Sequence, residues 1–348
     1  DGLIARLQEA NGLLDQAIDS GQTVDGDIIF DGNPQKWKKL SNALQLRILL
    51  HLSNKQDVSS EMSNIVNNAL LFESNEDNAV LNYLGSFPND YPLFPLKQGE
   101  FDSVRFSQQA LFSLEDYNDP RLGRYARPIN VTDIGTFNST DAVYSGGENG
   151  DARGGLCEKG GSTLGSRYYD YPGHPVGDIE ANGIISTYSE QELIIAEAIN
   201  KSDISVTGNA EEHYKNAIEA SMSYYNVNFN SFDWTDFNDF YDNSGVEYNG
   251  SLDQIKEQKW LATYFHGMEP YFDTRRMVYE ANNGNGLKPG LVPFLVNPCQ
   301  NINDDNMPTR FVYPGDEISL NNENYRQAIE NLGGTDTNSQ NGITWIME

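Results

Sequence analysis

The sequence predicts a mainly α-helical protein whose helical blocks alternate with long irregular segments. Apolar residues recur at helical spacing in the first 72 residues and again from residue 187 to residue 226. Between these blocks Asn, Gly, Pro and Tyr become frequent, and such residues favour turns and loops. Hydrophobic residues make up 38% of the 348 residues, which is enough for a sizeable core and argues against global disorder.

Three helices are expected in the first block. The first has an apolar stripe that begins at Leu3 and ends near Ser20. Pro34 opens the second, because proline is well tolerated in the first helical turn, and Trp37 lies on its apolar face. The third is expected over Ser59–Phe72. Because the chain begins directly in a helical pattern, we expect it to continue from an earlier segment.

The region from residue 73 to residue 186 contains one clear helical pattern, RFSQQALFSLEDY at residues 105–117. A loop region of this length inside a compact chain is uncommon, and it is usually functional or disordered. Its many aromatic residues argue against disorder. This irregular region is therefore the part of the chain that we expect to carry the function.

Two amphipathic helices follow in the second block. In TYSEQELIIAEAINK, the Ser189 hydroxyl is expected to cap the helix ahead of Glu190 and Glu192. The next pattern is NAEEHYKNAIEASMSYY, with an apolar stripe from Tyr214 onward. Two helices of this length joined by a short loop are typical of a tetratricopeptide-like hairpin. Nearer the C-terminus, residues 310–332 are expected to end in one short helix.

The chain carries 51 acidic and 23 basic residues, for a formal net charge of −28. Nucleic acid is excluded as a partner, because binding to its phosphates requires clustered Lys and Arg. Direct electrostatic contact with an anionic membrane surface is disfavoured for the same reason. Neutral and cationic ligands remain, and solubility is the simplest role of so much acidity.

No catalytic motif is visible. The four histidines show no metal-ligand spacing, and His51 and His213 are expected to be structural. There is no G-x-S-x-G, P-loop or dinucleotide fingerprint. The stretches NINDDN and DWTDFNDFYDN contain oxygen ligands suited to calcium, but neither fits an EF-hand, so solvated loops are favoured. We therefore predict no catalytic, metal or cofactor site. Whether Cys157 and Cys299 pair or remain thiols is left open.

Five segments resemble motifs of the SusD/RagB-like family and occur in the family's order. They are DIIFDGNPQKWKKLSNALQLRILLHLSN, DPRL, TYSEQELIIAEA, IKEQKWLATYFHGMEPYFDTRRM and RFVYPGDEISLNNENYRQAI. Each alone is weak, but five in order are specific, and they extend from about Asp27 to the C-terminal part. In detail they are closest to the subgroup called SusD-like type 2.

The resemblance implies a single domain over residues 1–348 that lacks the family's N-terminal segment. The helical scaffold would lie mainly in residues 1–72 and 187–226, and irregular ligand-facing segments in residues 73–186 and 227–348. Family members are outer-membrane lipoproteins at the cell surface and have no catalytic centre. They cover a SusC-like TonB-dependent transporter and bind oligosaccharides or, in some members, peptides. A helical protein-interaction scaffold is an alternative, and a polysaccharide hydrolase ranks lowest, because no motif supports its carboxylate pair.

The adjacent arginines of the fourth motif, Arg275 and Arg276, are expected to be structural. Because a buried arginine must be paired, we expect Arg275 to bond a carboxylate, either Glu269 or Asp273. Three aromatic residues are expected in the core rather than in a sugar-binding platform. These are Trp37, Trp260 and Phe265.

Ligand contacts are expected in the irregular stretches FPNDYPLF, VYSGGENGD and SRYYDYPGH. Neutral sugars stack on aromatic rings and bond to planar polar side chains, and these stretches supply both. The ligand-binding candidates are Tyr91, Tyr144, Asn149, Asp151, Arg153, Tyr168, Tyr169 and Tyr171. Loop packing is the competing role for each, because long loops build small cores of their own.

Overall fold

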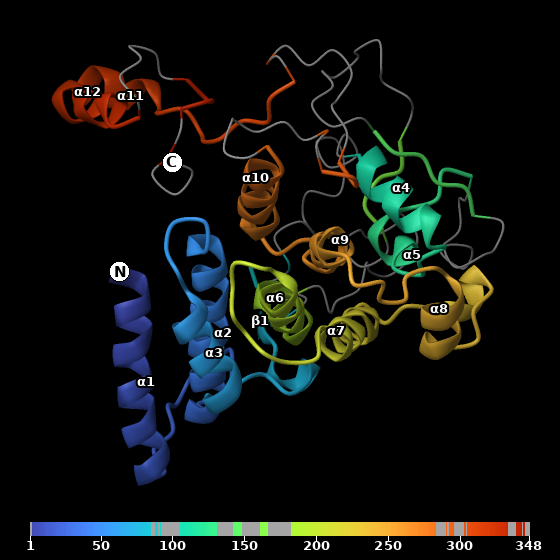
Figure 1. Ribbon diagram of the computed structural model, residues 1–348, viewed down its shortest axis with the longest axis horizontal. Coiled ribbons are helices and arrows are strands. Elements are labelled where there is room, and N and C mark those ends of the chain that lie inside the picture. The colour runs from blue at the N-terminus through green and yellow to red at the C-terminus, as the bar shows by residue number, and fades with distance from the viewer. Residues whose placement is uncertain are drawn as a thin grey trace.

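The computed structural model describes residues 2–84, 88, 89, 91, 105–130, 142–147, 161–165, 182–282, 290, 292–295, 303, 305–332, 339–342 and 344. In these ranges the protein is mainly helical, which confirms the predicted fold class, and the helices are arranged side by side (Figure 1). The elements of the first half are α1 (Gly2–Ser20), α2 (Pro34–Leu52), α3 (Ser59–Asn68), β1 (Ala79–Leu81), α4 (Gln108–Asp116) and α5 (Leu122–Tyr125). Those of the second half are β2 (Gly183–Ser186), α6 (Tyr188–Asn200), α7 (Ala210–Tyr224), α8 (Phe237–Asn243), α9 (Leu252–Ala262), α10 (Glu269–Ala281), α11 (Gly315–Leu320) and α12 (Asn322–Glu330). None of the helices in the described ranges is long and apolar enough to span a bilayer.

The loop before α2 is fixed by the carboxylate of Asp27. This carboxylate accepts hydrogen bonds from the backbone N–H groups of Ile29 and Gly32, both at 2.9 Å, and from Nε1 of Trp37 at 2.8 Å. The Trp37 ring packs edge-on against Phe30, with 5.3 Å between the ring centroids, beside a small buried cluster. Trp37 therefore belongs to the core, as the sequence predicts.

The third helix is shorter than the sequence predicts, because the chain turns extended at Ala69 and α3 ends at Asn68. The side chain of buried Gln191 then pairs with the backbone of Phe72. Its Nε2 donates to the Phe72 carbonyl at 3.1 Å, and its Oε1 accepts from the Phe72 N–H at 2.9 Å. This pairing satisfies backbone groups that a longer helix would have used internally.

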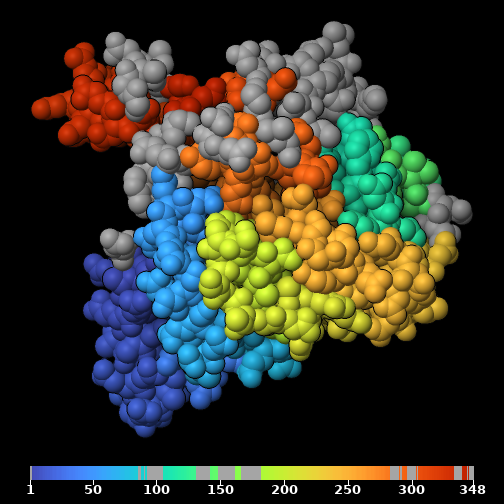
Figure 2. Space-filling view, in the orientation of Figure 1, coloured from blue at the N-terminus to red at the C-terminus, as the bar shows by residue number. Residues whose placement is uncertain are grey.

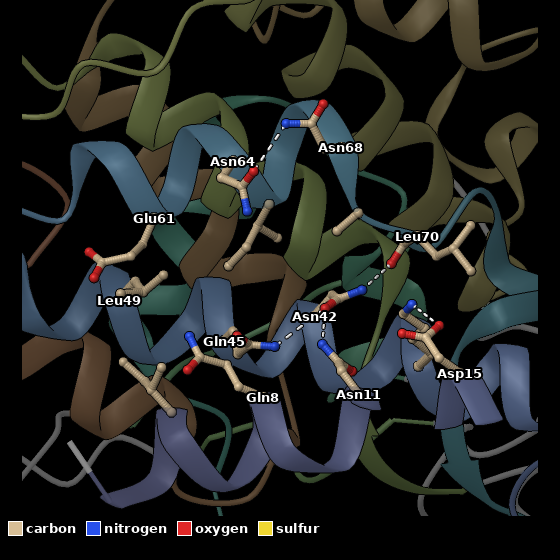
Figure 3. Close-up of a pocket in the computed structure, with 14 residues that line it drawn as sticks. Gln8, Asn11, Asp15, Asn42, Gln45, Leu49, Glu61, Asn64, Asn68 and Leu70 are labelled. Atoms are coloured by element: carbon tan, nitrogen blue, oxygen red, sulfur yellow. Dashed lines mark hydrogen bonds and ion pairs between the residues drawn. The ribbon is translucent and has the colours of Figure 1, made fainter. Parts of the chain in front are cut away.

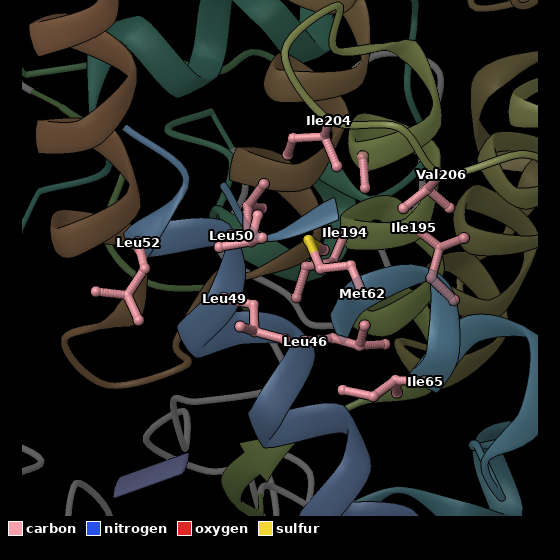
Figure 4. Close-up of a cluster of buried hydrophobic side chains, with 12 residues drawn as sticks. Leu46, Leu49, Leu50, Leu52, Met62, Ile65, Ile194, Ile195, Ile204 and Val206 are labelled. Carbon is pink, nitrogen blue, oxygen red and sulfur yellow. The ribbon is translucent and has the colours of Figure 1, made fainter. Parts of the chain in front are cut away.

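The N-terminal helices share one core with α6, in which apolar side chains of α2, α3 and α6 interdigitate (Figure 4). The cluster consists of Leu46, Leu49, Leu50, Leu52, Val58, Met62, Ile65, Ile194, Ile195, Ala198, Ile204 and Val206. Full burial of each large apolar side chain contributes about 1.5–3 kcal/mol. The two helical blocks of the sequence therefore form one scaffold.

α6 and α7 lie side by side, as expected for the predicted helical hairpin (Figure 1). The expected cap at Ser189 is wrong, because the N-terminal cap of α6 is Thr187, whose Oγ1 accepts from the Glu190 N–H at 3.2 Å. Thr187 is the extended residue ahead of the first turn, whereas Ser189 already lies inside the helix. The Ser189 hydroxyl instead donates to the Ala217 carbonyl of α7 at 2.7 Å, which ties the two helices together.

None of the α1 residues is fully buried, but its apolar stripe is half-buried and Ile4 packs against the core shared by α2, α3 and α6. Polar contacts to α2 add to this packing. Asn11 Nδ2 donates to Asn42 Oδ1 at 2.7 Å, and Lys38 pairs with Asp15. Figure 3 shows Asn11, Asp15 and Asn42 along a polar groove between α1, α2 and α3. The groove has a volume of about 380 Å³. The attachment of α1 therefore combines directional hydrogen bonds with partial apolar burial.

The C-terminal part contains more helix than the sequence predicts. α8 forms within the acidic run DWTDFNDFYDN, where a solvated loop is expected, because Asp236 caps it and Phe237 and Phe240 are buried beneath it. α11 and α12 replace the single short helix expected near the C-terminus. In these two helices Ile329 is the only buried residue, and they project from the body at the upper left of Figure 2.

Candidate ligand-binding face

The two ends of the irregular region meet at one place on the scaffold. β1 pairs antiparallel with β2, with Ala79 opposite Ser186 and Leu81 opposite Gly183. The chain between these strands therefore leaves the scaffold and returns to it at the same point. The described parts of this region include α4 and α5, which lie on the α9 side of the molecule (Figure 1).

An aromatic cluster lies under the described irregular segments. The Tyr125 ring is stacked on Tyr264, with 4.3 Å between centroids, and meets Tyr225 edge-on at 4.7 Å. The Tyr225 hydroxyl donates to the Tyr264 carbonyl at 2.7 Å. Because burial raises the pKa of Tyr125 and Tyr264, both hydroxyls stay neutral at ordinary pH. The cluster thus ties α5 and α7 to the segment that follows α9, and it forms a rigid base for the irregular segments.

The irregular segments are held to this base by backbone hydrogen bonds. Phe106 donates to the Ser162 carbonyl at 2.7 Å, and Gly147 donates to the Phe106 carbonyl at 2.8 Å. Gly165 donates to the Tyr125 carbonyl at 2.9 Å. A Cβ at Gly165 would lie 2.4 Å from the Arg124 carbonyl oxygen, so only glycine allows this approach.

Two of the eight candidate ligand-binding residues, Tyr91 and Tyr144, lie within the described structure. Both are half-buried, and both pack against the buried hydrophobic cluster that contains Tyr125 and Tyr225. Tyr91 also meets Tyr83 edge-on, with 5.4 Å between centroids. Burial raises the pKa of the Tyr144 hydroxyl. The remaining candidates lie outside the described residues. They are Asn149, Asp151, Arg153, Tyr168, Tyr169 and Tyr171. Cys157 and Cys299 lie outside them too.

Trp260 and Phe265 occupy core positions, as the sequence predicts. Trp260 packs between two buried clusters, and its ring centroid lies 5.8 Å from that of Phe294. Phe265 packs against the aromatic cluster beside Tyr264, with 4.8 Å between centroids. Phe265 also has a left-handed backbone (φ 64°), which is uncommon for a bulky residue and marks the tight turn between α9 and α10.

Residues from separate sequence motifs meet in a buried ion-pair network between α6, α9 and α10. Arg276 lies 2.7 Å from both Glu197 and Asp273 and 2.8 Å from Glu280. Lys259 pairs with Glu197 and also with Asp273, the latter at 2.9 Å. Since all five side chains are largely shielded from solvent, these charges depend on one another rather than on water. The network therefore joins α6 to the consecutive helices α9 and α10, which come much later in the chain.

A second ion pair joins the first helical block to the second. Arg47 pairs with Glu190 in a bidentate arrangement. Its Nε donates to Oε1 and its Nη2 to Oε2 of Glu190, each at 2.6 Å. Arg47 also donates to the Ile185 carbonyl at 2.9 Å. The pair therefore fixes α2 against both α6 and the end of β2.

The DPRL motif forms a third buried polar cluster. Asp119 and Arg121 have no exposed side-chain surface, and their closest charged atoms are 2.6 Å apart. Arg121 also donates to Oε1 of Gln258 at 2.6 Å. Gln258 belongs to the QKW triplet of α9, so two of the family-like motifs bond to each other. Sequence reasoning did not assign this partner to Gln258.

The expected partner of Arg275 is wrong. Arg275 donates to the backbone carbonyl of Thr309 and lies over the rings of Tyr271 and Phe272, with Cζ at 5.1 and 5.0 Å from their centroids. It is Arg276 that pairs with Asp273. Helix geometry explains the difference, because residues two apart face different sides of a helix whereas residues three or four apart are neighbours.

The described histidines near the core contact carboxylates on other helices. His51 Nε2 lies 2.6 Å from Glu269, and His213 Nδ1 lies 2.8 Å from Glu192. These contacts join α2 to α10 and α6 to α7, in line with the predicted structural roles. Within the described ranges, no group of three or more His, Cys, Asp or Glu residues is arranged to hold a metal ion.

The buried ion pairs predict acid sensitivity. Burial alone would raise the pKa of the carboxyl groups of Glu190, Asp273 and Glu280. The charge of Arg47 on Glu190, and that of Arg276 on the other two, outweighs burial and lowers each pKa, to about 2 for Glu280. A carboxyl whose folded pKa is depressed stabilises the fold above its unfolded pKa of about 4 and loses that contribution as pH falls.

We therefore expect the free energy of unfolding, measured in urea at constant ionic strength, to decrease between about pH 5 and pH 2. Glu280→Gln removes one titrating group and should make this pH dependence shallower. An unchanged slope in the variant would contradict the assignment of Glu280 to the stabilising set.

Comparison with known proteins identifies the family. Residues 1–314 match the SusD-like_2 family, which is described as starch-binding and associating with the outer membrane. The chain belongs to the SusD-like_2 family. No curated protein shows significant sequence similarity to it.

Solved structures share the fold of this SusD-like_2 chain. A SusD homologue from Bacteroides fragilis NCTC 9343 is 26% identical, with a TM-score of 0.76, over 99% of this chain and 73% of the other. A protein from Bacteroides vulgatus ATCC 8482, for which outer-membrane location and nutrient binding have been suggested, is 29% identical, with a TM-score of 0.76, over 100% and 74%. A chitin-binding SusD homologue from Flavobacterium johnsoniae is 17% identical, with a TM-score of 0.75, over 99% and 71%, and this likeness shows the fold alone.

Proposed function

We propose that this protein captures glycan fragments at the outer-membrane surface and delivers them to a SusC-like TonB-dependent transporter. The observation that carries the proposal is the SusD-like_2 match over residues 1–314, because that family is described as starch-binding and outer-membrane associated. The description of the family as starch-binding supports a polysaccharide fragment as the ligand class. The protein would be held at the cell surface as a lipoprotein, and the SusC-like partner can be tested by co-purification from outer membranes.

The arrangement of the aromatic residues supports this function. A rigid cluster under the irregular segments positions further Tyr side chains, and aromatic rings bind the C–H faces of sugars. We place the ligand contacts in the irregular segments at the eight residues given by the sequence, of which Tyr144 and Tyr91 lie against the cluster. A ring of this kind, locked by packing, loses little freedom when a ligand binds.

The charge arrangement favours binding without catalysis. Hydrolysis of a glycosidic bond requires two carboxyl groups that flank the bond in an open cleft. The buried carboxylates Glu190, Glu197 and Asp273 are instead paired with cations inside the scaffold. A protein that delivers intact oligosaccharides to a transporter needs no turnover, and no cofactor is required for this role.

The contribution of Tyr144 can be tested by calorimetric titration with a panel of neutral oligosaccharides and short peptides. We expect Tyr144→Ala to weaken saccharide binding by about 1 kcal/mol, roughly fivefold, through loss of the ring and of the loop packing beneath it. Tyr144→Phe keeps the ring and should retain most of the affinity. Phe311→Ala changes an exposed ring elsewhere and should have no effect.

Peptide binding without any saccharide response would instead assign the protein to the peptide-binding type of this family. Release of reducing sugar that depends on one carboxylate would overturn the non-catalytic role.

A further inference from the structure

The two adjacent arginines of α10 have opposite electrostatic surroundings. Arg276 is buried and lies within ion-pair distance of three carboxylates. Arg275 is half-buried and makes no ion pair with any described residue. Its Nε is buried and has no hydrogen-bond partner among the described atoms. Burial lowers the pKa of Arg275, and the group that partly opposes this effect is the Tyr271 hydroxyl rather than a carboxylate.

Arg275 lines an open cleft of about 670 Å³ between the first turns of α1, the C-terminal half of α2 and the start of α10. Its floor and walls include Leu3, Ile48, Leu52 and Phe272. Phe272 has 39% of its surface exposed, so part of its ring is accessible to a ligand. The cleft has the usual composition of a ligand site, which is a mostly apolar surface with a few polar groups.

A second cation, Arg6 of α1, lines the same cleft. Arg6 is exposed and makes no ion pair with any described residue. The other cationic groups in the lining are already committed, because Arg47 pairs with Glu190 and His51 contacts Glu269. Two arginines without carboxylate partners among the described residues therefore line one mostly apolar cleft. The carboxylate that shares this lining, Glu269, contacts His51.

These features define the chemistry of the ligand. Arginine binds carboxylates through strong charge-assisted hydrogen bonds. A bound carboxylate would therefore supply the negative counter-charge that Arg275 lacks. The Phe272 ring offers a surface for the C–H face of a sugar. The volume is sufficient for a short oligosaccharide. At physiological ionic strength charges elsewhere on the chain are screened over about 8 Å. Within the cleft, Arg275 and Arg6 outnumber the one lining carboxylate, Glu269, which contacts His51.

We propose that this cleft is a second binding site, which takes a carboxylate-bearing saccharide such as a hexuronate oligomer. Arg275 and Arg6 hold the carboxylate, and Phe272 contacts the sugar ring. The assignment of the ligand as a saccharide rests on the proposed function. The requirement for a carboxylate rests on the two arginines alone. The cleft is lined by residues of α1, α2 and α10, and none of them belongs to residues 73–186, where the candidate ligand contacts lie.

Calorimetric titration with trigalacturonate and with neutral galactotriose tests the proposal. The two probes differ at C6, where the first has a carboxylate and the second a hydroxymethyl group. We expect trigalacturonate to bind at least about tenfold more tightly, and Arg275→Gln and Arg6→Gln each to remove about tenfold of that affinity. Arg326→Gln, which alters an exposed arginine of α12, should leave binding unchanged.

Two further variants complete the test: one separates binding from folding, and the other separates the cleft from the proposed glycan face. Arg275→Lys keeps the charge but not the planar fork, so it should retain more affinity than Arg275→Gln at equal thermal stability. Tyr144→Ala alters the proposed glycan face and should leave trigalacturonate binding intact.

The second site would be overturned if trigalacturonate failed to bind, or if Arg326→Gln lost as much affinity for it as Arg275→Gln. If neutral sugars still bound and responded to Tyr144→Ala, the proposed function would stand without it. Arginine-dependent binding of trigalacturonate without neutral binding would support the second site alone. Arginine-dependent binding of a peptide with a free C-terminal carboxylate, but not of its amide or of trigalacturonate, would overturn the assignment to a saccharide.

Discussion

Arg276→Met is expected to lower the free energy of unfolding by about 3–5 kcal/mol, the usual cost of removing one partner from a buried ion pair. The Arg276 guanidinium lies within 2.8 Å of carboxylates on both α6 and α10. Without it, Glu197 and Asp273 share only Lys259, and Glu280 keeps only lysine partners. The excess buried negative charge must then be neutralised by proton uptake or exposed to water.

Arg275→Met is the matched control, because it removes the same charge one residue earlier on the same helix. Arg275 bonds one backbone carbonyl and two ring faces, and it pairs with no described carboxylate. We expect its loss to cost about 1–2 kcal/mol, from one charge-assisted hydrogen bond and partly exposed cation–π contacts. Urea unfolding of both variants at pH 7 measures the difference. Equal losses would show that the ion-pair network does not act as a unit.

The network also explains the acid sensitivity expected from its carboxylates. In Arg276→Met the pKa values of Asp273 and Glu280 should rise toward ordinary values, because the substitution removes the guanidinium charge that lowers both most strongly. The variant should therefore lose less stability than the wild type between about pH 5 and pH 3, although it starts lower. The opposite result would mean that the acid sensitivity arises elsewhere.

The helical scaffold was largely predictable from the sequence, because periodicity and capping are local. Pro34 marks the start of α2, and the first helix ends at Ser20 as its stripe indicates. Local signals failed where a distant residue decides the backbone. The side chain of Gln191, more than a hundred residues away, pairs with the Phe72 backbone beyond the end of α3, and no residue near Phe72 in the sequence indicates this contact.

The arginine pair shows what sequence spacing could have supplied. Asp273, Arg276 and Glu280 are separated by three and four residues, which is the spacing of ion pairs along one helix face. That pattern identifies Arg276 as the paired arginine. The third carboxylate, Glu197, comes from α6 and could not be assigned without the fold.

The candidate ligand-binding face was less predictable than the scaffold. Composition indicates which segments are irregular, but it does not show which tyrosines pack inward. Tyr125 and Tyr225, neither of which was among the ligand-binding candidates, form the centre of the aromatic cluster. Tyr144 was selected from its neighbours in the sequence, and its position against that cluster depends on contacts between distant segments.

Asp119→Asn is expected to cost about 3–5 kcal/mol of unfolding free energy, because it leaves a buried guanidinium without its counter-charge. Asp119 and Arg121 are both fully buried, and the Asp119 charge raises the pKa of Arg121 although burial alone would lower it. Asparagine keeps the shape, but it can place an N–H donor against the donors of Arg121. Gln258 then supplies a neutral acceptor only.

The double variant Asp119→Asn with Arg121→Met removes both charges, and it should be more stable than Asp119→Asn alone, since an uncompensated buried charge costs more than a neutral gap. Asp116→Asn changes an exposed carboxylate three residues earlier and should shift stability by no more than about 0.5 kcal/mol. Because the Arg121 backbone carbonyl accepts hydrogen bonds from Arg124 and Tyr125, the damage should reach the base of the candidate ligand-binding face. Oligosaccharide affinity in Asp119→Asn should therefore fall even at temperatures where the protein remains folded. A stable variant with full affinity would show that this buried pair supports neither the fold nor the face.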